Sequence, residues 1–357
     1  MKTNHRNYLN LAFEAAKINL GKTSENPSVG CIVVKNDSVI LSTFTSVGGR
    51  PHAEFNAFKK KNKINNANIY LTMEPCTHYG KTPPCTNILN KKRIKNLYYM
   101  FNDVDKRTCN KSKKILQKKG ITVKKYKLNK YKDFYESYIS FKNKNTPLID
   151  AKLAISKDYF TISKKSKWIT NSYSRRRAHL IRSQYDCIIS TSKSINLDNS
   201  LLNCRIENFN TNKPDLVIVD LNLKIKKNLN LFKNKKRRII IITSILKNQK
   251  INLLKKKGIK FVYIKSLKDT KDLEYMFSIL KSFNYQRVLV ESGLKFLNFL
   301  LLKRYIFNLF IFKSGQKIGA NGYNNSYLNL IKKIKLKDKV KVNLNGDSLY
   351  KIKLNHV

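Results

Sequence analysis

Three short segments carry residue types that can hold a metal ion and move protons. Residues 51–54 read Pro-His-Ala-Glu, residues 74–76 read Glu-Pro-Cys, and residues 83–85 read Pro-Pro-Cys. A catalytic zinc takes three protein ligands and keeps a fourth position for water or substrate. His52, Cys76 and Cys85 supply three ligands of suitable type. The spacing therefore predicts one catalytic Zn²⁺ per chain.

Glu54 is the candidate catalytic residue beside this metal. A helix is expected to begin near His52, so the Glu54 carboxylate lies close to the ion without ligating it. Zinc lowers the pKa of a bound water to about 7, and a nearby carboxylate can carry protons from that water to a ring nitrogen and a departing amine. The combination of His-x-Glu with Pro-Cys is typical of zinc-dependent base deaminases.

The distance between the two cysteines distinguishes this chain from most such deaminases. Cytidine deaminases carry Pro-Cys-x-x-Cys, whereas eight residues separate Cys76 from Cys85 here. The stretch 74–85, Glu-Pro-Cys-Thr-His-Tyr-Gly-Lys-Thr-Pro-Pro-Cys, and residues 26–30, Asn-Pro-Ser-Val-Gly, resemble the riboflavin-biosynthesis deaminases. The resemblance implies a pocket for a phosphorylated pyrimidine, with Asn26 among the substrate contacts. Ser28 stands where that family usually has Asn.

The second half of the chain extends the resemblance. Matching segments follow in family order at residues 152–154, 166–170, 182, 194–202, 205 and 290–293. Together they resemble the bacterial bifunctional riboflavin-biosynthesis enzymes, which join this deaminase to a reductase of dihydrofolate-reductase-like fold. The resemblance runs from about residue 8 to beyond residue 300. It implies hydrolysis of the 2-amino group of 2,5-diamino-6-ribosylamino-4(3H)-pyrimidinone 5′-phosphate, followed by NADPH-dependent reduction of the ribosyl chain to ribityl.

The same resemblance assigns roles to residues of the reductase half. The implied substrate contacts are Ser166, Arg182, Leu202, Arg205 and Glu291. The implied NADPH contacts are Ala154, Trp168, Ser194, Asp198, Gly293, Leu294, Lys295, Phe296, Leu297, Asn298 and Phe299. The chemistry is consistent, because arginines hold sugar phosphates through charge-assisted hydrogen bonds. A glycine before a helix also lets a cofactor phosphate approach the backbone N–H groups of the helix start.

Departures from the family pattern leave alternatives open. Residues 156–159 read Ser-Lys-Asp-Tyr where the family usually has Ser-Leu-Asp-Gly, and a bulky Tyr159 could obstruct the nicotinamide pocket. A deaminase-only enzyme with a degenerate reductase domain is therefore one alternative. A tRNA or nucleoside deaminase with an accessory domain is a second. A basic RNA-binding protein with a structural zinc is a third, and His78 is its nearest candidate fourth ligand.

The periodicity of apolar residues indicates how these sites are positioned. Helical spacing at residues 8–16 is followed by strand patterns at 29–34, 38–45, 68–72, 96–101 and 121–126, with helices near 52, 84 and 111–119. After a polar boundary at 143–147, strand patterns return at 148–155, 186–191, 216–219, 238–243, 260–264, 287–291 and 307–312, with helices near 175–182, 245–257, 271–283 and 294–302. This alternation predicts the α/β class. We expect a cytidine-deaminase-like α/β/α domain over residues 1–145 and a dihydrofolate-reductase-like α/β domain over residues 146–357.

The amino-acid composition bears on whether the chain binds nucleic acids or membranes. The 73 Lys and Arg against 22 Asp and Glu give a net charge of +51, but 41% hydrophobic residues argue for a folded chain. The basic residues are spread along the chain and accompanied by abundant Asn, Ile, Tyr and Phe, which is typical of an AT-rich genome, so we expect no specific nucleic-acid partner. Residues 1–10 lack an apolar segment and no stretch approaches 18 apolar residues, which predicts a cytoplasmic protein without a membrane partner. The family resemblance implies a homo-oligomer.

Overall fold

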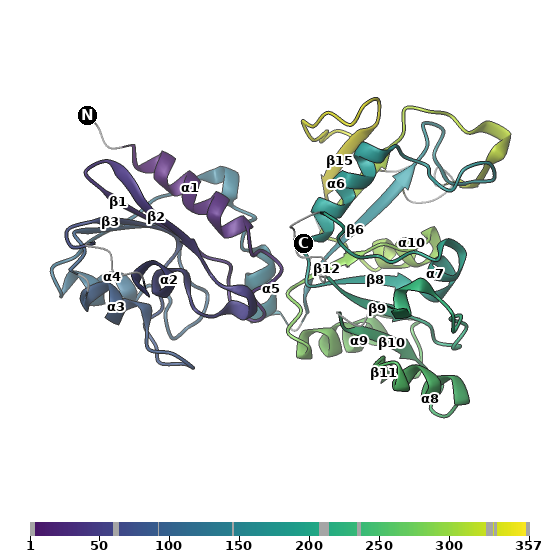
Figure 1. Ribbon diagram of the computed structural model, residues 1–357, viewed down its shortest axis with the longest axis horizontal. Helices are drawn as coiled ribbons and strands as arrows, with labels where there is room; N and C mark the ends of the chain where they lie inside the picture. The colour runs from purple at the N-terminus through teal and green to yellow at the C-terminus, as the bar shows by residue number, and fades with distance from the viewer. Residues whose placement is uncertain are drawn as a thin grey trace. The chain divides into compact units, whose positions relative to one another are not determined.

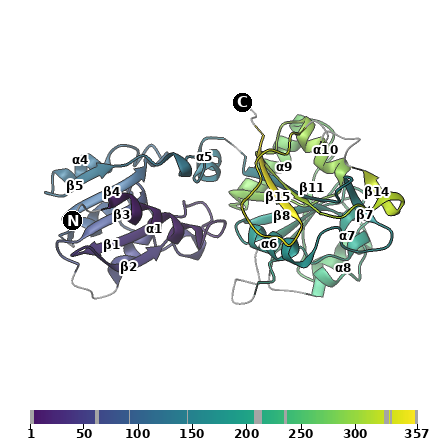
Figure 2. The ribbon, with the colours of Figure 1, turned by 90° about the horizontal axis from the view of Figure 1, so that it is seen from above.

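The computed structural model describes residues 4–59, 64–91, 93–144, 146–206, 214–233, 237–325, 331 and 334–354. The chain divides into two compact units, residues 1–145 and 146–357. Each unit is an α/β layer structure with its own sheet, so the predicted α/β class is confirmed (Figures 1 and 2).

The first unit consists of one five-stranded sheet and its helices. Its elements are α1 (His5–Lys17), β1 (Gly30–Lys35), β2 (Ser38–Phe44), η1 (Val47–Gly49), α2 (Ala53–Lys59), β3 (Asn68–Met73), α3 (Cys85–Lys91), β4 (Asn96–Phe101), α4 (Ser112–Gln117), β5 (Thr122–Lys125), η2 (Asn129–Tyr131) and α5 (Glu136–Asn143).

The strands of the first unit follow the order β2-β1-β3-β4-β5. The β1–β2 hairpin turns at Asn36 and Asp37, which adopt positive φ values of 49° and 57°, as a two-residue hairpin turn requires. Strand β1 also pairs antiparallel with β3, and β3, β4 and β5 run parallel to one another. The carboxyl ends of β3 and β4 therefore open at the same edge of the sheet.

Helices cover both faces of this sheet. Helix α1 lies over one face, and α2, α3 and α4 lie over the other (Figure 1). The apolar side of α1 buries Leu9, Ala12 and Phe13 against the strands. The Phe13 ring also stacks on Tyr131, with ring centroids 3.8 Å apart, so η2 closes the same core. The layers are α/β/α, as predicted.

The second unit is built on an eight-stranded sheet. Its elements are β6 (Leu148–Ile155), β7 (Phe160–Ser163), α6 (Ser172–Arg182), β8 (Cys187–Thr191), α7 (Ser192–Asp198), β9 (Asp215–Val219), η3 (Asn230–Lys233), β10 (Ile239–Thr243), α8 (Gln249–Lys256), β11 (Lys260–Tyr263), α9 (Thr270–Ser282), β12 (Arg287–Val290), α10 (Leu294–Leu302), β13 (Asn308–Lys313), η4 (Gly319–Asn321), β14 (Gly322–Asn325) and β15 (Ser348–Lys353).

The large sheet is buried on both faces. Its order is β11-β10-β9-β8-β12-β6-β13-β15, and all pairs are parallel except β13 with β15. In β10, Ile240 and Ile242 join a core beneath α9 and α10, whereas Ile239 and Ile241 join a second core beneath α6 and α8. Continuous apolar runs are what a parallel sheet covered on both faces needs. Strand β12 inserts between β8 and β6, which brings the segments after β8 and β12 together.

The predicted elements are found within a few residues of their expected bounds, but several short ones were missed. These are α5, β7, α7, β14 and β15. Strands β7 and β14 pair only with each other in a small separate sheet, and the residues of β7 are half-buried, so no clear apolar pattern marks them. Residues 207–213, between α7 and β9, lie outside the described residues.

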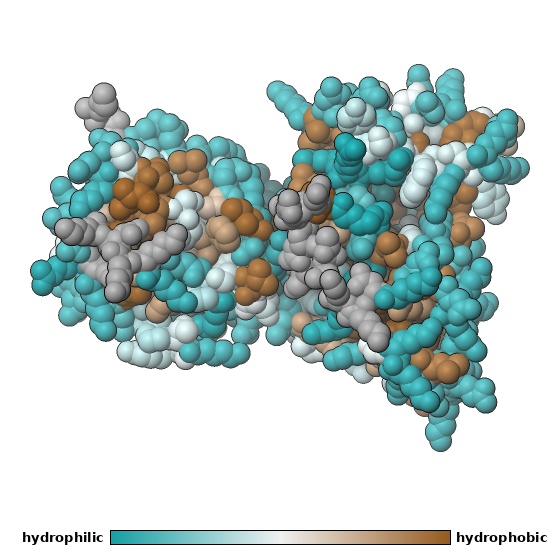
Figure 3. Space-filling view, viewed as in Figure 1, coloured by the Kyte–Doolittle hydropathy of each residue, from teal (hydrophilic) through white to brown (hydrophobic). Residues whose placement is uncertain are grey.

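One face of the molecule illustrates the distribution of polar residues. On the face shown in Figure 3, hydrophilic residues dominate and hydrophobic residues gather in small groups. Within the described ranges, no helix has the length and apolar character needed to cross a membrane.

Gly30 lies where β1 passes directly beneath α1, and the packing there leaves no room for a side chain. A Cβ atom at this position would lie 1.8 Å from the backbone oxygen of Ala12 and 2.9 Å from the backbone nitrogen of Ala16. We expect Gly30→Ala to lower the free energy of unfolding by about 3 kcal/mol, since the backbone of a packed helix must move. Urea unfolding followed by circular dichroism measures this change.

Gly80→Ala is the matched control. Its Cβ would meet only the end of the Arg50 side chain, at 3.3 Å. We expect a change below about 0.5 kcal/mol. Equal stability losses in the two variants would contradict the close approach of α1 to β1.

Candidate active site

The three predicted zinc ligands converge at the carboxyl end of β3. His52 directly precedes α2, Cys76 follows β3, and Cys85 is the first residue of α3. The His52 Nδ1 atom lies 3.3 Å from Cys85 Sγ and 3.7 Å from Cys76 Sγ, and the three ligand atoms are within 4.8 Å of one another. The tertiary structure thus brings together residues that are 24 and 33 positions apart in the chain.

The geometry and chemistry of this donor set fit zinc. A tetrahedral zinc, with Zn–S near 2.3 Å and Zn–N near 2.0 Å, separates neighbouring ligand atoms by about 3.5–3.8 Å. The Cys76 sulfur accepts a hydrogen bond of 3.2 Å from the backbone N–H of Cys85. Hydrogen bonding from Cys85 and His52 lowers the pKa of the Cys76 thiol far below its usual value. A thiolate ligand is therefore favoured at this position.

His78 does not complete a four-ligand structural site. Among the described His, Cys, Asp and Glu residues, the cluster at this place has three members, and neither His78 nor Glu54 belongs to it. The His78 Nδ1 atom instead lies 3.0 Å from the hydroxyl of Thr108. Three protein ligands are the arrangement of a catalytic site that keeps one position open.

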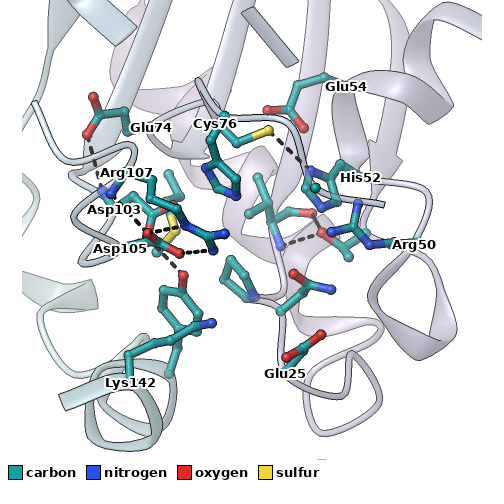
Figure 4. Close-up of a pocket in the computed structure, with 18 of the residues that line it drawn as sticks. Glu25, Arg50, His52, Glu54, Glu74, Cys76, Asp103, Asp105, Arg107 and Lys142 are labelled. Atoms are coloured by element: carbon teal, nitrogen blue, oxygen red, sulfur yellow. Dashed lines mark hydrogen bonds and ion pairs between the residues drawn. The ribbon is translucent and has the colours of Figure 1, made fainter. Parts of the chain in front are cut away.

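Glu54 occupies the first turn of α2 and is only 3% exposed. Burial raises the pKa of its carboxyl group above the usual value, against the opposing effect of His52. A carboxyl group whose pKa moves toward neutrality can both take and give a proton near pH 7. The structure therefore places Glu54 as predicted, beside the ligands and outside their set (Figure 4).

A cavity of about 250 Å³ opens in front of these residues. Asn26, the predicted substrate contact, lies in its lining. Figure 4 shows His52 and Glu54 on one side of this cavity and the segment carrying Asp105 and Arg107 on the other. The full lining comprises Glu25, Asn26, Pro27, Val29, Thr45, Arg50, His52, Glu54, Met73, Glu74, Cys76, His78, Gly80, Lys81, Asp103, Asp105, Arg107, Tyr138 and Lys142.

Several of these lining residues were not predicted. Arg50 donates a 2.6 Å hydrogen bond to the Thr82 hydroxyl and so ties the loop between the two cysteines to the segment before His52. Asp105 accepts two hydrogen bonds from the Arg107 guanidinium, and this pairing holds the pKa of Asp105 well below its usual range. The sequence carried no signal for Arg50 or Arg107, because basic residues are abundant throughout this chain.

In the second unit, Glu291 is the centre of a buried charged cluster. It follows β12, and its two carboxylate oxygens accept hydrogen bonds of 2.5 and 2.9 Å from Nε and Nη2 of Arg182. Lys152 Nζ, from the neighbouring β6, lies 3.6 Å from the same carboxylate. Burial opposes ionisation, but the charges of Arg182 and Lys152 lower the pKa of Glu291 to about 2. The predicted substrate residues Arg182 and Glu291 are thus in direct contact.

Arg205 lies beside this cluster. Its Nη1 donates a 2.8 Å hydrogen bond to the side chain of Asn203, whose backbone carbonyl accepts a 3.1 Å bond from Arg182. Burial, and then the neighbouring charge of Arg182, lower the pKa of Arg205. Two neighbouring arginines form a site suited to an anion such as a phosphate.

Two predicted cofactor residues meet at the carboxyl ends of adjacent parallel strands. The backbone N–H of Gly293 donates a 2.9 Å hydrogen bond to Ser194 Oγ. Gly293 precedes α10 and Ser194 lies in the first turn of α7, so two helix starts face the same region. Ligands of parallel α/β sheets bind outside the carboxyl ends of the strands, at such a point.

Other members of the predicted cofactor set are placed less favourably. The side chains of Leu294 and Leu297 are buried in the core between α10 and the sheet, so they cannot face a ligand. The backbone N–H of Leu294, at the start of α10, is the part that a cofactor could reach, whereas the N–H of Leu297 donates a 3.2 Å hydrogen bond to the Gly293 carbonyl. Trp168 is 52% exposed, with the Arg175 guanidinium 4.7 Å from the centre of its ring. Leu202, which the resemblance assigns to the substrate and not to the cofactor, is buried in the other core of this unit.

Tyr159 occupies the position where the resembling enzymes usually have glycine. Its φ value is +70°, in the left-handed region that favours glycine. The ring packs against the core, and Lys313 Nζ lies 4.5 Å from its centre. The turn between β6 and β7 therefore keeps the glycine-type conformation although the residue has changed.

Comparisons with known proteins match both units. A family model of the cytidine and deoxycytidylate deaminase zinc-binding region matches residues 2–101, and a model of the RibD C-terminal domain matches residues 147–320. A riboflavin biosynthesis protein RibD from Buchnera aphidicola subsp. Baizongia pistaciae is 36% identical over 218 residues, which are 59% of this chain and 58% of that protein. The sequence alignments thus span less than two thirds of the curated relatives' length.

Solved structures cover almost the whole chain. RibD from Acinetobacter baumannii has a TM-score of 0.82 at 24% identity, with 98% of each chain covered, which supports the fold. A diaminohydroxyphosphoribosylaminopyrimidine deaminase/5-amino-6-(5-phosphoribosylamino)uracil reductase from Thermotoga maritima has a TM-score of 0.82 at 25% identity, again with 98% of each chain covered. These matches confirm the predicted order of a cytidine-deaminase-like domain and a dihydrofolate-reductase-like domain. Both domain models match in this order and the solved structures cover almost the whole chain, so the chain is similar to RibD riboflavin biosynthesis proteins along nearly its full length.

Proposed function

We propose that this chain is a bifunctional enzyme of riboflavin biosynthesis. The first unit hydrolyses the 2-amino group of 2,5-diamino-6-ribosylamino-4(3H)-pyrimidinone 5′-phosphate. The second unit uses NADPH to reduce the ribosyl chain of the product, which yields 5-amino-6-ribitylaminouracil 5′-phosphate. The observation that carries the proposal is the convergence of His52, Cys76 and Cys85 beside the buried Glu54, at a cavity of about 250 Å³.

In the first step, His52, Cys76 and Cys85 would hold the metal. Zinc in this position supplies Lewis acidity that makes a water molecule nucleophilic near neutral pH. Glu54 takes a proton from that water and delivers protons to the ring nitrogen and the 2-amino group. The oxygen of the water becomes the new carbonyl oxygen, and the carbon–nitrogen bond breaks to release ammonia. The raised pKa of Glu54 suits this exchange of protons.

In the second step, the buried charged cluster would bind the substrate and the helix starts would bind the cofactor. NADPH supplies the hydride that, together with one proton, converts the ribosyl chain to ribityl. Arg205 and Arg182 bind the sugar phosphate, and Glu291 keeps Arg182 in a single orientation through two hydrogen bonds. Ser194 and the backbone N–H groups at the start of α10 bind the cofactor at the carboxyl ends of β8 and β12.

The alternatives are less well supported by the same observations. A structural zinc would need a fourth ligand, and His78 bonds to Thr108 instead. An accessory domain unrelated to reduction would not explain a match of residues 147–320 to the RibD C-terminal domain. The proposal includes a cytoplasmic location, a homo-oligomer and no specific nucleic-acid partner. The absence of disulfides among the six cysteines, all of which lie in the described part of the chain, is compatible with a reducing compartment.

The direct test follows the two reactions separately in the purified chain. Ammonia release from the diaminopyrimidine substrate reports the first step, and oxidation of NADPH at 340 nm with the deaminated compound reports the second. Ammonia release without NADPH oxidation would favour the deaminase-only alternative. If neither reaction takes place, the proposal as a whole is contradicted.

Cys76→Ser tests the metal site. Serine is a poor zinc ligand, so we expect the variant to lose its zinc and its ammonia release together. Metal analysis of the purified protein and the ammonia assay measure the two effects. Cys109→Ser is the control, because this cysteine lies outside the ligand cluster. Full activity of the Cys76 variant would remove these residues as the catalytic metal site.

Glu54→Gln separates metal binding from proton transfer. Glutamine has the same size but cannot carry a proton, so zinc should remain while deamination slows by about 10²–10⁴-fold. Metal analysis and steady-state kinetics measure the two quantities. Glu14→Gln, at an exposed position on α1, should change neither. A loss below about tenfold would contradict the catalytic role of Glu54.

Arg205→Ala tests the second unit. Removal of one hydrogen bond to a charged group weakens binding by about 1.5–3 kcal/mol, so KM for the deaminated substrate should rise by about 10- to 150-fold. NADPH oxidation at 340 nm measures this, and Arg238→Ala, at an exposed position over the Phe283 ring, is the control. An unchanged KM would exclude Arg205 from the substrate site.

Tyr159→Gly in the same assay addresses the deaminase-only alternative. We expect the wild type to oxidise NADPH, because Tyr159 already adopts the conformation that glycine would have. An inactive wild type with an active Tyr159→Gly variant would mean that the tyrosine has disabled the reductase.

A further inference from the structure

Glu74 has a buried carboxylate that the proposed deamination does not use. It follows β3, precedes the Pro-Cys pair that carries a zinc ligand, and is 3% exposed. Its Oε2 accepts hydrogen bonds from the backbone N–H groups of Asp103 (3.2 Å) and Asn110 (3.0 Å). Its Oε1 accepts bonds from the backbone N–H (3.1 Å) and the hydroxyl (2.8 Å) of Ser112. All four donors belong to residues 102–112, the segment after β4, which we call the 102–112 wall.

We propose that Glu74 is a positioning residue that sets the 102–112 wall of the deaminase pocket for substrate binding. This inference rests on the proposed deaminase function, because it concerns the same pocket. Glu74 acts through the wall and does not touch the reacting atoms.

The 102–112 wall presents charged groups to the cavity. Asp103, Asp105 and Arg107 all belong to the cavity lining. Asp105 orients the Arg107 guanidinium through bonds of 2.9 and 2.5 Å, and Tyr138 donates a 2.9 Å hydrogen bond to Asp103. Figure 4 shows Glu74 on the same side of the cavity as these side chains, above Arg107 and Asp103 in this view. Any movement of the wall would displace the charged groups that a phosphorylated pyrimidine meets.

The wall also supports the segment between the two cysteine ligands. Thr108 accepts a 3.3 Å hydrogen bond from the backbone N–H of Thr77, and His78 contacts the same hydroxyl. The backbone N–H of Glu74 donates a 2.7 Å bond to the carbonyl of Phe101. Glu74 therefore joins the end of β3, which carries the metal ligand, to the segment that begins at the end of β4.

A carboxylate is the side chain that this position requires. It has two oxygens with about four acceptor sites and no donor, which matches the four donors around it. Glutamine has nearly the same shape but replaces one oxygen with an N–H₂ group, which would face donors and leave them without an acceptor. Ser112 is fully buried, so water cannot replace the lost acceptor there.

Glu74→Gln in the full-length, zinc-loaded chain is the test. We expect zinc content to stay at one ion per chain, kcat for ammonia release to change by less than about threefold, and KM to rise by at least tenfold. We also expect hydrogen exchange at the amides of Asp103, Asn110 and Ser112 to accelerate by at least tenfold, while amides within β3 stay unchanged.

Ser112→Ala is the graded variant, since it removes one of the four hydrogen bonds and keeps the three from the backbone. It should raise KM by less than Glu74→Gln does, and it preserves the test if Glu74→Gln does not fold. Thr82→Ala, which loses the Arg50 contact on the other wall, should leave exchange in the 102–112 wall unchanged.

Two results would overturn the proposal. The first is unchanged exchange at the three amides in the Glu74 and Ser112 variants, which is decisive even if the wild type does not deaminate the substrate. The second is a fall in kcat with loss of zinc at an unchanged KM, which would assign Glu74 to the metal site. A wild type that releases no ammonia would contradict the proposed function alone.

Discussion

The ligand atoms of His52, Cys76 and Cys85 lie within 4.8 Å of one another, although the three residues belong to different segments of the chain. The fold must therefore hold these segments together. The first unit meets this constraint by ending β3 opposite the starts of two helices. The amide at the start of α3 donates to the Cys76 sulfur, and His52 is fixed because its carbonyl accepts from Asn56 within the first turn of α2. The parallel pairing of β3 with β4 then brings the 102–112 wall to the same edge. The cavity exists because these strand ends and helix starts meet there.

Three buried glutamates illustrate how surroundings decide the role of one residue type. Glu54 has few compensating donors, so burial raises its pKa and a proton can be exchanged there. Glu291 faces Arg182 and Lys152, which lower its pKa and keep it a permanent anion. Glu74 faces four neutral donors and serves as an acceptor for a loop. A carboxylate group can thus suit proton exchange, charge pairing or the anchoring of a loop, according to what lies within hydrogen-bonding distance.

Basic residues are abundant along the whole chain and do not by themselves mark either site. The net charge of +51 is distributed along the whole chain, and the cationic residues that matter are those held in place by a partner, such as Arg182 by Glu291 and Arg107 by Asp105. An arginine fixed by a carboxylate presents its remaining donors in one direction, whereas a solvated lysine does not. Because basic residues are so abundant, the composition alone cannot identify the ones that lie at the two sites.

The sequence by itself determined the α/β class and the long elements, and it singled out the candidate metal ligands His52, Cys76 and Cys85 with Glu54. These features leave local signals, because buried strands need apolar runs and a metal site needs ligand side chains of particular types. It could not place β7, whose residues are half-buried, or β14, whose Tyr323 and Asn324 are exposed. The two strands pair only with each other. It also could not show that the side chains of Leu294 and Leu297 face the core. Both residues lie at the start of a helix, where the backbone can bind a cofactor while the side chain is buried. Three contacts join residues that are far apart in the chain. Arg182 and Glu291 are 109 positions apart, and Ser194 and Gly293 are 99 apart. Glu74 and the residues that it anchors in the 102–112 wall are up to 38 apart. Only the tertiary structure decided these contacts, because they depend on which strands are neighbours in the sheet and not on any local pattern.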